Sequence, residues 1–397
     1  MIGTDDAGGV DRGLHRAEAV HAVAEEALGE VRGIARRSCP LAEAMTDTLR
    51  LSVLDLVPVR SGQTSAGAVA ASVRLAQLAD RLGFTRYWFA EHHNMPAVAS
   101  TTPPVLIAAT AARTERIRVG SGGVMLPNHA PLVVAEQFAA LAALAPGRID
   151  LGIGRAPGSD PVITQLLRVS GPTADVDRFP DHVADILSLL SPDGATLRLT
   201  SGREYPITAT PAASEVPELW LLGSSDYSAK LAAELGLPYV FANHFSGEGL
   251  ERALELYRTE YRPSERHPSP VTFLTMNASV APTVEEAEAR ALPQLRSMAR
   301  LRTNRPMRPL ETVEEAQSAP ADSMADELIA GMRRRWVIAD AATAAAELRR
   351  FAERHGVDEV MVSPIAGAFE SEPTDAAPGR EQTIELLAGE LSAPVVE

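Results

Sequence analysis

Residues 49–90 have the sequence LRLSVLDLVPVRSGQTSAGAVAASVRLAQLADRLGFTRYWFA, which contains one unit of the pattern that decides the fold. Leu49–Val57 is a short apolar run of the kind that forms a buried strand. Apolar residues then recur at helical spacing from Val69 up to Gly83, which predicts the end of a helix. A second apolar run at 86–90 predicts the next strand.

The same alternation continues through the rest of the chain. Six more apolar runs predict strands at 117–121, 149–153, 218–222, 239–242, 271–280 and 359–362. Helical patterns lie between them, and those at 104–113 and 131–145 begin with proline, which suits a first helical turn. Alternating strands and helices pair in parallel, and eight such units favour a closed barrel over an open sheet. We therefore predict an α/β fold, a single (β/α)8 TIM barrel.

The chain has 397 residues, roughly 150 more than a minimal barrel of about 250 residues requires. We expect this surplus in decorations of one domain, residues 45–397. A small hairpin is predicted at 196–210, and a last helix at 382–391 could close the barrel wall. The Arg- and Pro-rich insertion at 299–335 is predicted to be a long irregular segment, either a lid or disordered.

Residues 1–44 differ in composition from the rest and predict an N-terminal extension, either helical or disordered. The first residues lack the basic start and apolar core of a secretion signal. Cys39 is the single cysteine, which excludes an internal disulfide or a multi-cysteine metal site and fits a reducing compartment. We therefore expect a cytoplasmic protein without a metal ion.

The charge balance also limits the partners. Acidic residues number 52 against 37 basic ones, for a formal net charge of -15. Nucleic acids and anionic membranes attract clustered Lys and Arg, so neither is an expected partner. No apolar run approaches the ~18 residues that a membrane-spanning helix needs.

The first candidate site follows the strand at 86–90, because active sites of parallel barrels lie where strands end. Here Glu91, His92 and His93 stand together. Two adjacent histidines point to opposite sides, which disfavours a shared metal ion. One imidazole at the barrel mouth could transfer a proton near neutral pH, with Glu91 to orient it. A polar strand end that bonds only its own loop is the alternative.

Glycines mark the second candidate, where Gly120, Gly122 and Gly123 lie at the end of the third predicted strand. Glycine is costly inside a sheet, so this cluster indicates a bulge or a flat ligand against the backbone. An ordinary glycine turn is the alternative. The third candidate is Arg155, which could be a surface ion pair or a ligand for an anion. Its surroundings do not match a dinucleotide fingerprint, because Pro157 stands where glycine is needed.

The fourth candidate is the junction of a strand with a helix at 223–228, GSSDYS. Glycine and serine at a helix N-terminus can form a phosphate cradle, since free amides point at the anion. Plain capping by Ser225 or Asp226 would give the same pattern, and both interpretations stay open. Motifs of serine hydrolases, zinc peptidases and P-loop nucleotide hydrolases are absent from the sequence.

Four stretches together resemble the bacterial luciferase-like family of flavin-dependent monooxygenases, in its non-luminous subgroup. The likeness extends from about residue 45 to residue 391 and rests on Leu51–Leu56, Tyr87–Met95, Gly120–Pro131 and Gly147–Gly158. It implies a single (β/α)8 barrel that binds reduced FMN, supplied by a separate NAD(P)H:flavin reductase. It also implies that O2 reacts through a peroxyflavin to oxygenate a small or medium organic substrate. A homo-oligomer such as a dimer is expected.

The resemblance also assigns roles to individual residues. His92 matches the catalytic histidine, proposed to act as a base or to stabilise the flavin-oxygen adduct, with Glu91 beside it. Gly122 and Gly123 match a non-proline cis peptide beneath the flavin ring, and the 299–335 insertion matches a mobile loop that would cover the site. The residues implied to hold the FMN phosphate are Arg155, Arg178, Gly223, Ser224, Ser225 and Tyr227.

Two departures and two alternatives accompany this likeness. Gly154 stands where light-emitting members carry a reactive cysteine, and Ala339-Asp340-Ala341 replaces a usual Gly-Thr-Pro turn.

The protein could instead use a deazaflavin for hydride transfer, or bind flavin without catalysis. The presence of His92, Glu91 and Arg155 argues against the non-catalytic interpretation. For the substrate, the best candidates are Asp55, His244 and Phe245, which follow predicted strands.

Overall fold

The computed structural model describes residues 49–156, 161–169, 176–212, 215–245 and 247–391. The predicted N-terminal extension at 1–44, with Cys39, lies outside these described residues.

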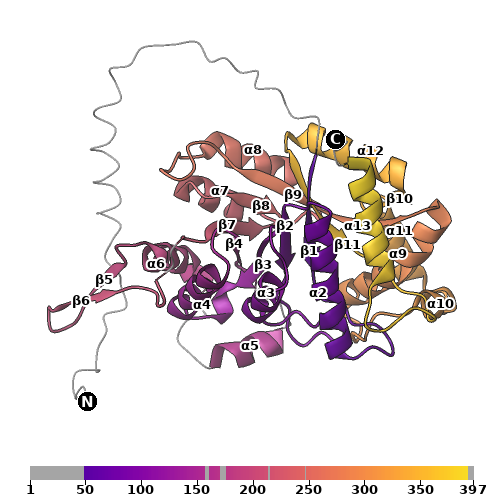
Figure 1. Ribbon diagram of the computed structural model, residues 1–397, viewed down its shortest axis with the longest axis horizontal. Coiled ribbons are helices and arrows are strands. Elements are labelled where there is room, and N and C mark those ends of the chain that lie inside the picture. The colour runs from indigo at the N-terminus through magenta and orange to yellow at the C-terminus, as the bar shows by residue number, and fades with distance from the viewer. Residues whose placement is uncertain (1–48, 157–160, 170–175, 213–214, 246, 392–397) are drawn as a thin grey trace, which may run out of the picture.

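The eight predicted strands are present and form a closed parallel barrel (Figure 1). The strands are paired in the order β9-β11-β1-β2-β3-β4-β7-β8, and the pairing of β8 with β9 closes this order into a ring. The prediction of a (β/α)8 TIM barrel is confirmed. Its strands are β1 (Arg50–Asp55), β2 (Arg86–Phe89), β3 (Arg118–Met125), β4 (Ile149–Gly154), β7 (Glu218–Gly223), β8 (Tyr239–Phe241), β9 (Thr272–Ala281) and β11 (Glu359–Pro364).

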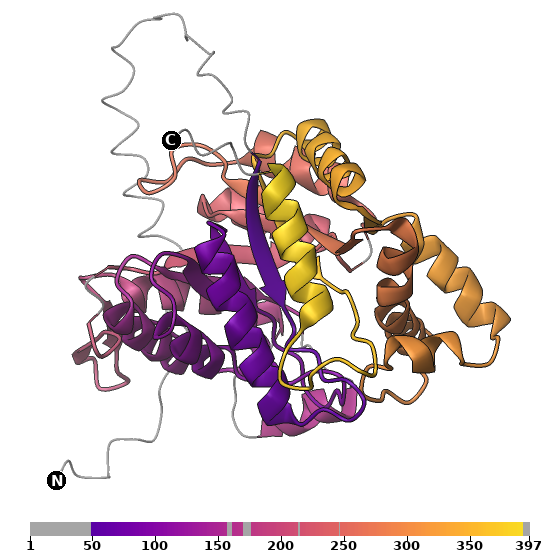
Figure 2. The same ribbon diagram turned by 45° about the vertical axis from the view of Figure 1, so that its right-hand side comes forward.

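Helices surround the barrel and follow the local signals of the sequence. The hydroxyl of Thr64 caps the first of them, α2, and Gly83, at φ +80°, follows its end. The last helix, α13, lies beside α2, so the two ends of the domain meet (Figures 1 and 2). The helices are α2 (Ser65–Arg81), α3 (Pro103–Ala111), α4 (Pro131–Leu144), α5 (Pro161–Val169), α6 (Phe179–Leu190), α7 (Asp226–Leu235), α8 (Leu250–Glu260), α9 (Val284–Arg302), α12 (Ala341–His355) and α13 (Pro378–Leu391), with short 3-10 turns η3 (Leu126–Asn128) and η4 (Val176–Arg178).

Large side chains fill the interior of the barrel. The rings of Trp88, Trp220 and Phe273 pack on one another with centroids 4.9–5.6 Å apart. Deeper in the barrel, the Arg86 guanidinium lies 4.7 Å from the Trp220 ring and donates to the buried carboxylate of Asp150 at 2.9 Å. The interior is therefore a packed core, and a ligand must bind at one end of the barrel.

The predicted hairpin is formed by β5 (Ala195–Arg198) and β6 (Glu204–Ile207), which project from the barrel (Figure 1). The prediction for 299–335 was wrong in one respect, because this insertion is not irregular. It contains α10 (Val313–Gln317) and α11 (Ser323–Arg333), and α11 packs on α9 (Figure 2).

Two capping signals explain the helices of the insertion. Thr312 and Glu315 form a capping box at the start of α10, and the Asp322 carboxylate caps α11. An extra strand, β10 (Val337–Asp340), then pairs with the distal end of β9 outside the ring of eight. The Asp340 side chain caps α12 through the Thr343 N–H, which shows how Ala339-Asp340-Ala341 makes the turn.

In the part of the chain that the structure describes, no helix is both long enough and apolar enough to cross a lipid bilayer.

Candidate active site

A cavity opens at the mouth of the barrel, where β1, β8, β9 and β11 end and where α9 and the insertion lie over them. Asp55, His92, His244 and Phe245 are among its lining residues, so four predicted site residues meet there. The other described residues that line it are Leu54, Leu56, Pro58, Met95, Ala97, Val98, Asn277, Gln294, Ser297, Met298, Leu301, Met307, Leu310, Trp336, Ser363, Pro364, Ile365, Ala366, Gly367 and Arg380.

His92 follows β2, and its backbone N–H donates to Ser100 O at 3.0 Å. Its Nδ1 atom is buried and has no hydrogen-bond partner among the described residues. Burial lowers the pKa of His92 below its ordinary value, so the imidazole is neutral at pH 7. A neutral imidazole with an unsatisfied nitrogen can accept or donate one hydrogen bond at the cavity.

His244, beyond the end of β8, is the second imidazole of this cavity. Burial, and then the nearby imidazole of His92, lower the pKa of His244 from 6.5 to about 4. Its Nδ1 atom lies 2.9 Å from the Thr275 hydroxyl, which also accepts from the His244 backbone N–H and donates to Phe241 O. All of these bonds are satisfied together when Nδ1 carries the proton, which leaves Nε2 as an acceptor.

Glu91 lies on the other side of the strand end and does not hold His92. Its carboxylate accepts from His93 Nε2 at 2.9 Å, His129 Nε2 at 2.8 Å and the Met125 N–H at 3.0 Å. Burial alone would raise the pKa of Glu91, but these hydrogen bonds outweigh it and lower the pKa to about 2. The expectation that Glu91 orients His92 is therefore corrected: Glu91 is an ionised anchor for the loops that follow β2 and β3.

Gly122 and Gly123, which lie within β3, stand directly over the filled interior. The peptide bond between Gly122 and Gly123 is cis, and the register between β3 and β4 shifts at this point. A Cβ atom on Gly122 would lie 2.8 Å from Leu54 Cδ1, and one on Gly123 would lie 2.9 Å from the oxygen of Gly152. Glycine is thus required here by the packing of the barrel, whether or not a ligand lies above it.

Arg155, after β4, and Tyr227, in α7, come together at another part of the mouth. The guanidinium carbon lies 4.1 Å from the centroid of the tyrosine ring. Within the described residues, the side chain of Ser225 makes no capping hydrogen bond, so the first amides of α7 stay available. Gly223 is close-packed, since its Cβ would lie 2.3 Å from Ser228 Oγ. The sequence left open whether this stretch binds a phosphate or caps the helix, and the structure shows that the Ser225 side chain does not cap α7.

Arg178, the remaining predicted phosphate ligand, is not joined to this group among the described residues. It belongs to η4, and its ion partner is Asp181 at 3.8 Å.

Sequence reasoning missed several residues at the mouth. Arg380, in α13, donates to the Asp55 carboxylate at 2.5 Å, and Trp336 and Met298 line the cavity. His129 anchors Glu91 from beyond β3. None of them stands directly after a barrel strand, so the pattern of polar residues at strand ends does not reveal them.

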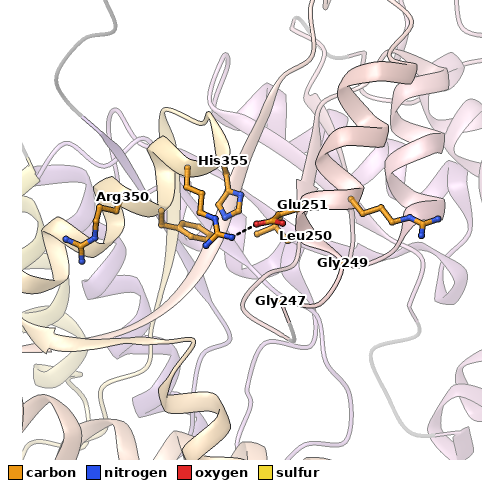
Figure 3. A pocket seen from close by; sticks show the side chains of 9 residues that line it. Gly247, Gly249, Leu250, Glu251, Arg350 and His355 are labelled. Carbon is orange, nitrogen blue, oxygen red and sulfur yellow. Dashed lines mark hydrogen bonds and ion pairs between the residues drawn. The ribbon is translucent and has the colours of Figure 1, made fainter.

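A second hollow lies away from the mouth, between α8 and α12 (Figure 3). The Glu251–Arg354 ion pair spans it, and Arg350 points away from that pair. A further lining residue, Arg252, pairs with Asp226 at 2.8 Å. None of the predicted site residues is among the described residues that line this hollow.

Comparisons with known proteins place these features in a family context. The family model described as luciferase-like monooxygenase matches residues 49–359. An Escherichia coli protein named luciferase-like monooxygenase is 47% identical over 247 residues, which are 62% of this chain and 70% of that protein. A Bacillus subtilis protein named N-acetyl-S-alkylcysteine monooxygenase is 37% identical over 245 residues, 60% of this chain and 70% of that protein.

Solved structures share the fold as well. The crystal structure of apo-MsnO8 covers 87% of this chain and 99% of its own, with a TM-score of 0.75 and 33% identity. A type II Baeyer-Villiger monooxygenase from Pseudomonas putida in complex with FMN has a TM-score of 0.64 at 17% identity, over 88% of this chain and 99% of its own. At this lower identity the likeness concerns the fold alone.

Proposed function

Since this chain belongs to the luciferase-like monooxygenase family, we propose that it is an FMN-dependent monooxygenase that oxygenates a small or medium organic molecule. The observation that carries the proposal is the division of one barrel mouth into two parts. Arg155 and the N-terminus of α7 form a cationic corner at the ends of β4 and β7. His92 and His244 line a mainly apolar cavity at the ends of β8, β9 and β11.

The cationic corner fits the phosphate of FMN. Arg155 is positioned by the Tyr227 ring, and the uncapped amides of α7 add hydrogen-bond donors, with Ser224 and Ser225 exposed beside them. A guanidinium and helix-terminal amides together are a favourable setting for a dianion. The Gly122–Gly123 peptide would then lie under the flavin ring, and Arg178 would contribute from η4. A separate reductase would deliver the flavin in its reduced form, which supplies the electrons that activate O2.

His92 would act at the boundary between the two parts. Its buried Nδ1 atom lacks a partner among the described residues, and the imidazole is neutral at pH 7. It can therefore accept a proton or hold a polar atom of a reacting group. One oxygen atom of O2 enters the substrate and the other leaves as water, and exclusion of bulk water from the cavity favours this outcome over release of peroxide.

The insertion would serve as the lid of this cavity. Leu301, Met307 and Leu310 line it, and Leu310 is tied to the loop after β1 by two backbone hydrogen bonds of 2.7 and 2.8 Å. Glu311 adds ion pairs to Arg296 at 2.7 Å and Arg300 at 3.6 Å. The lid would thus be a docked cover that opens only when these contacts are broken.

We further propose that the protein is a homodimer. α3 and α4 are apolar on most sides, and Val105 and Val133 are 64% and 47% exposed. An exposed apolar helix face of this kind is typical of an interface between copies. Light scattering coupled to size-exclusion chromatography would show twice the mass of one chain, and a monomer would contradict the proposal.

One series of measurements tests the proposed activity. The purified protein is titrated with FMN, reduced FMN and a deazaflavin, and then supplied with NADH, a flavin reductase and air. We expect flavin binding and oxygen consumption that increases when a substrate is present. Binding of the deazaflavin alone, with hydride transfer and no oxygen uptake, would replace the proposal by the dehydrogenase alternative. Flavin binding without any turnover would indicate a binding protein.

A further inference from the structure

On the basis of the proposed function, we propose that the substrate of the mouth cavity is an uncharged, mainly apolar molecule, and that this cavity discriminates against carboxylates and ammonium ions of the same size. The inference rests on the side chains that line the cavity and on where their charges are already used.

Apolar side chains from separate parts of the chain form most of the wall. The loop after β2 contributes Met95, α9 contributes Met298, and the insertion contributes Met307. Methionine is flexible and polarizable, so a wall with three of them adapts to apolar groups of varied shape. Their apolar neighbours in the wall are Leu54, Leu56, Pro58, Ala97, Val98, Phe245, Leu301, Leu310, Trp336, Pro364, Ile365 and Ala366.

Asp55 and Arg380 are the carboxylate and the guanidinium among the described lining residues, and they neutralise each other. Arg380 Nη2 donates to Asp55 Oδ1 at 2.5 Å, and the two residues are 5% and 0% exposed. Asp55 also accepts from the Val57 N–H and the Tyr87 hydroxyl. Arg380 Nε also donates to Pro364 O. Neither charge is free to pair with a ligand.

The remaining polar lining residues carry no charge at neutral pH. His92 and His244 are both neutral there, because burial lowers their pKa values. Asn277, Gln294, Ser297 and Ser363 are uncharged side chains. An anion or a cation in this cavity would lose its hydration without gaining an opposite charge, which is far more costly than burying an apolar group.

Matched probes of one chain length test this inference on the full-length, flavin-free protein at pH 7.5. Octan-1-ol, octanoate and octylammonium are titrated by calorimetry. The emission of Trp336 reports occupancy, since Trp88 and Trp220 are enclosed in the barrel. We expect octan-1-ol to bind at least tenfold more tightly than either ion. Equal or tighter binding of an ion, or binding of none of the three, would overturn the inference.

A charge placed in the wall should reverse the preference. Met298→Arg introduces an unpaired guanidinium, so the affinity for octanoate should rise at least tenfold while that for octan-1-ol falls. The matched control is Val284→Arg, on the same helix but 41% exposed and outside the cavity, which should change neither affinity. Leu301→Arg serves if Met298→Arg does not fold. An unchanged preference in a folded cavity variant would refute the inference.

Flavin binding is measured on the same samples by visible absorbance. Loss of flavin affinity together with a retained preference for octan-1-ol would contradict the proposed monooxygenase and leave the binding preference standing. Normal flavin binding with a preference for octanoate would refute the inferred preference for uncharged ligands and leave the proposed monooxygenase standing.

Discussion

Glu91 Oε1 lies 2.8 Å from His129 Nε2, although 38 residues separate the two in the chain. This hydrogen bond ties the loop after β2 to the segment that follows β3. The backbone that carries His92 is therefore fixed by a carboxylate that does not itself line the cavity.

Glu91→Gln should lower the free energy of unfolding by about 2 kcal/mol. The amide is uncharged, so the buried charge-assisted hydrogen bonds from His93, His129 and the Met125 N–H are weakened or lost. Urea unfolding measures the change. A difference below about 0.5 kcal/mol would show that the network does not stabilise the fold.

His92→Asn should reduce substrate oxygenation by about 10²–10³-fold, the range expected for loss of a proton-transfer group. FMN affinity should change by less than about threefold, because the cationic corner near Arg155 is untouched. Single-turnover oxygenation and a flavin titration separate the two quantities. A parallel loss of both would mean that His92 only supports the structure.

Arg155→Gln should weaken the binding of FMN by roughly 10–100-fold, as expected when a charge-assisted hydrogen bond is lost. Riboflavin, which has no phosphate, provides the control and should bind both forms equally. If Arg155→Gln weakens riboflavin and FMN to the same degree, the corner at Arg155 does not hold the phosphate.

The protein should lose stability as the pH falls from 6.5 to 4 through the protonation of His244. The pKa of His244 is lowered to about 4 in the folded state. Its contribution to the free energy of unfolding is therefore complete above pH 6.5 and is lost as the pH falls toward 4. The shift corresponds to about 3 kcal/mol as an upper figure. Comparing urea unfolding of the parent and His244→Gln at pH 7 and 4.5 isolates this contribution, and identical pH slopes would contradict it.

Glu91 gives a second acid-sensitive contribution in a lower pH window. Its folded pKa of about 2 lies below the ordinary 4.5, so its stabilisation is present above 4.5 and is lost as the pH falls toward 2.

Glu311→Gln should release more hydrogen peroxide per oxygen consumed. The substitution weakens the ion pairs to Arg296 and Arg300 that hold the insertion down, and water then enters the cavity more often. Breaking the Arg305–Asp322 pair with Arg305→Ala, whose side chain is 47% exposed, is the control. Peroxide yields equal to the parent in both variants would mean that the insertion does not act as a lid.

The barrel strands could be predicted because strands buried on both faces are continuous apolar runs, and all eight were located from such runs. The helices of the insertion were missed because its Arg and Pro content obscured the caps at Thr312 and Asp322. Contacts between distant residues lay beyond the sequence. Nothing in the local pattern pairs Asp55 with Arg380, 325 positions away.

The dense interior of the barrel limits the routes by which ligands can enter and leave. Since Trp88, Trp220 and Phe273 close it from below, a flavin and a substrate would have to arrive and depart through the same face. Each molecule can then obstruct the other, so the order in which they bind and are released would affect the rate of turnover. The product formed under the insertion would have to depart before the next flavin exchange, which makes this single entrance a natural point of control.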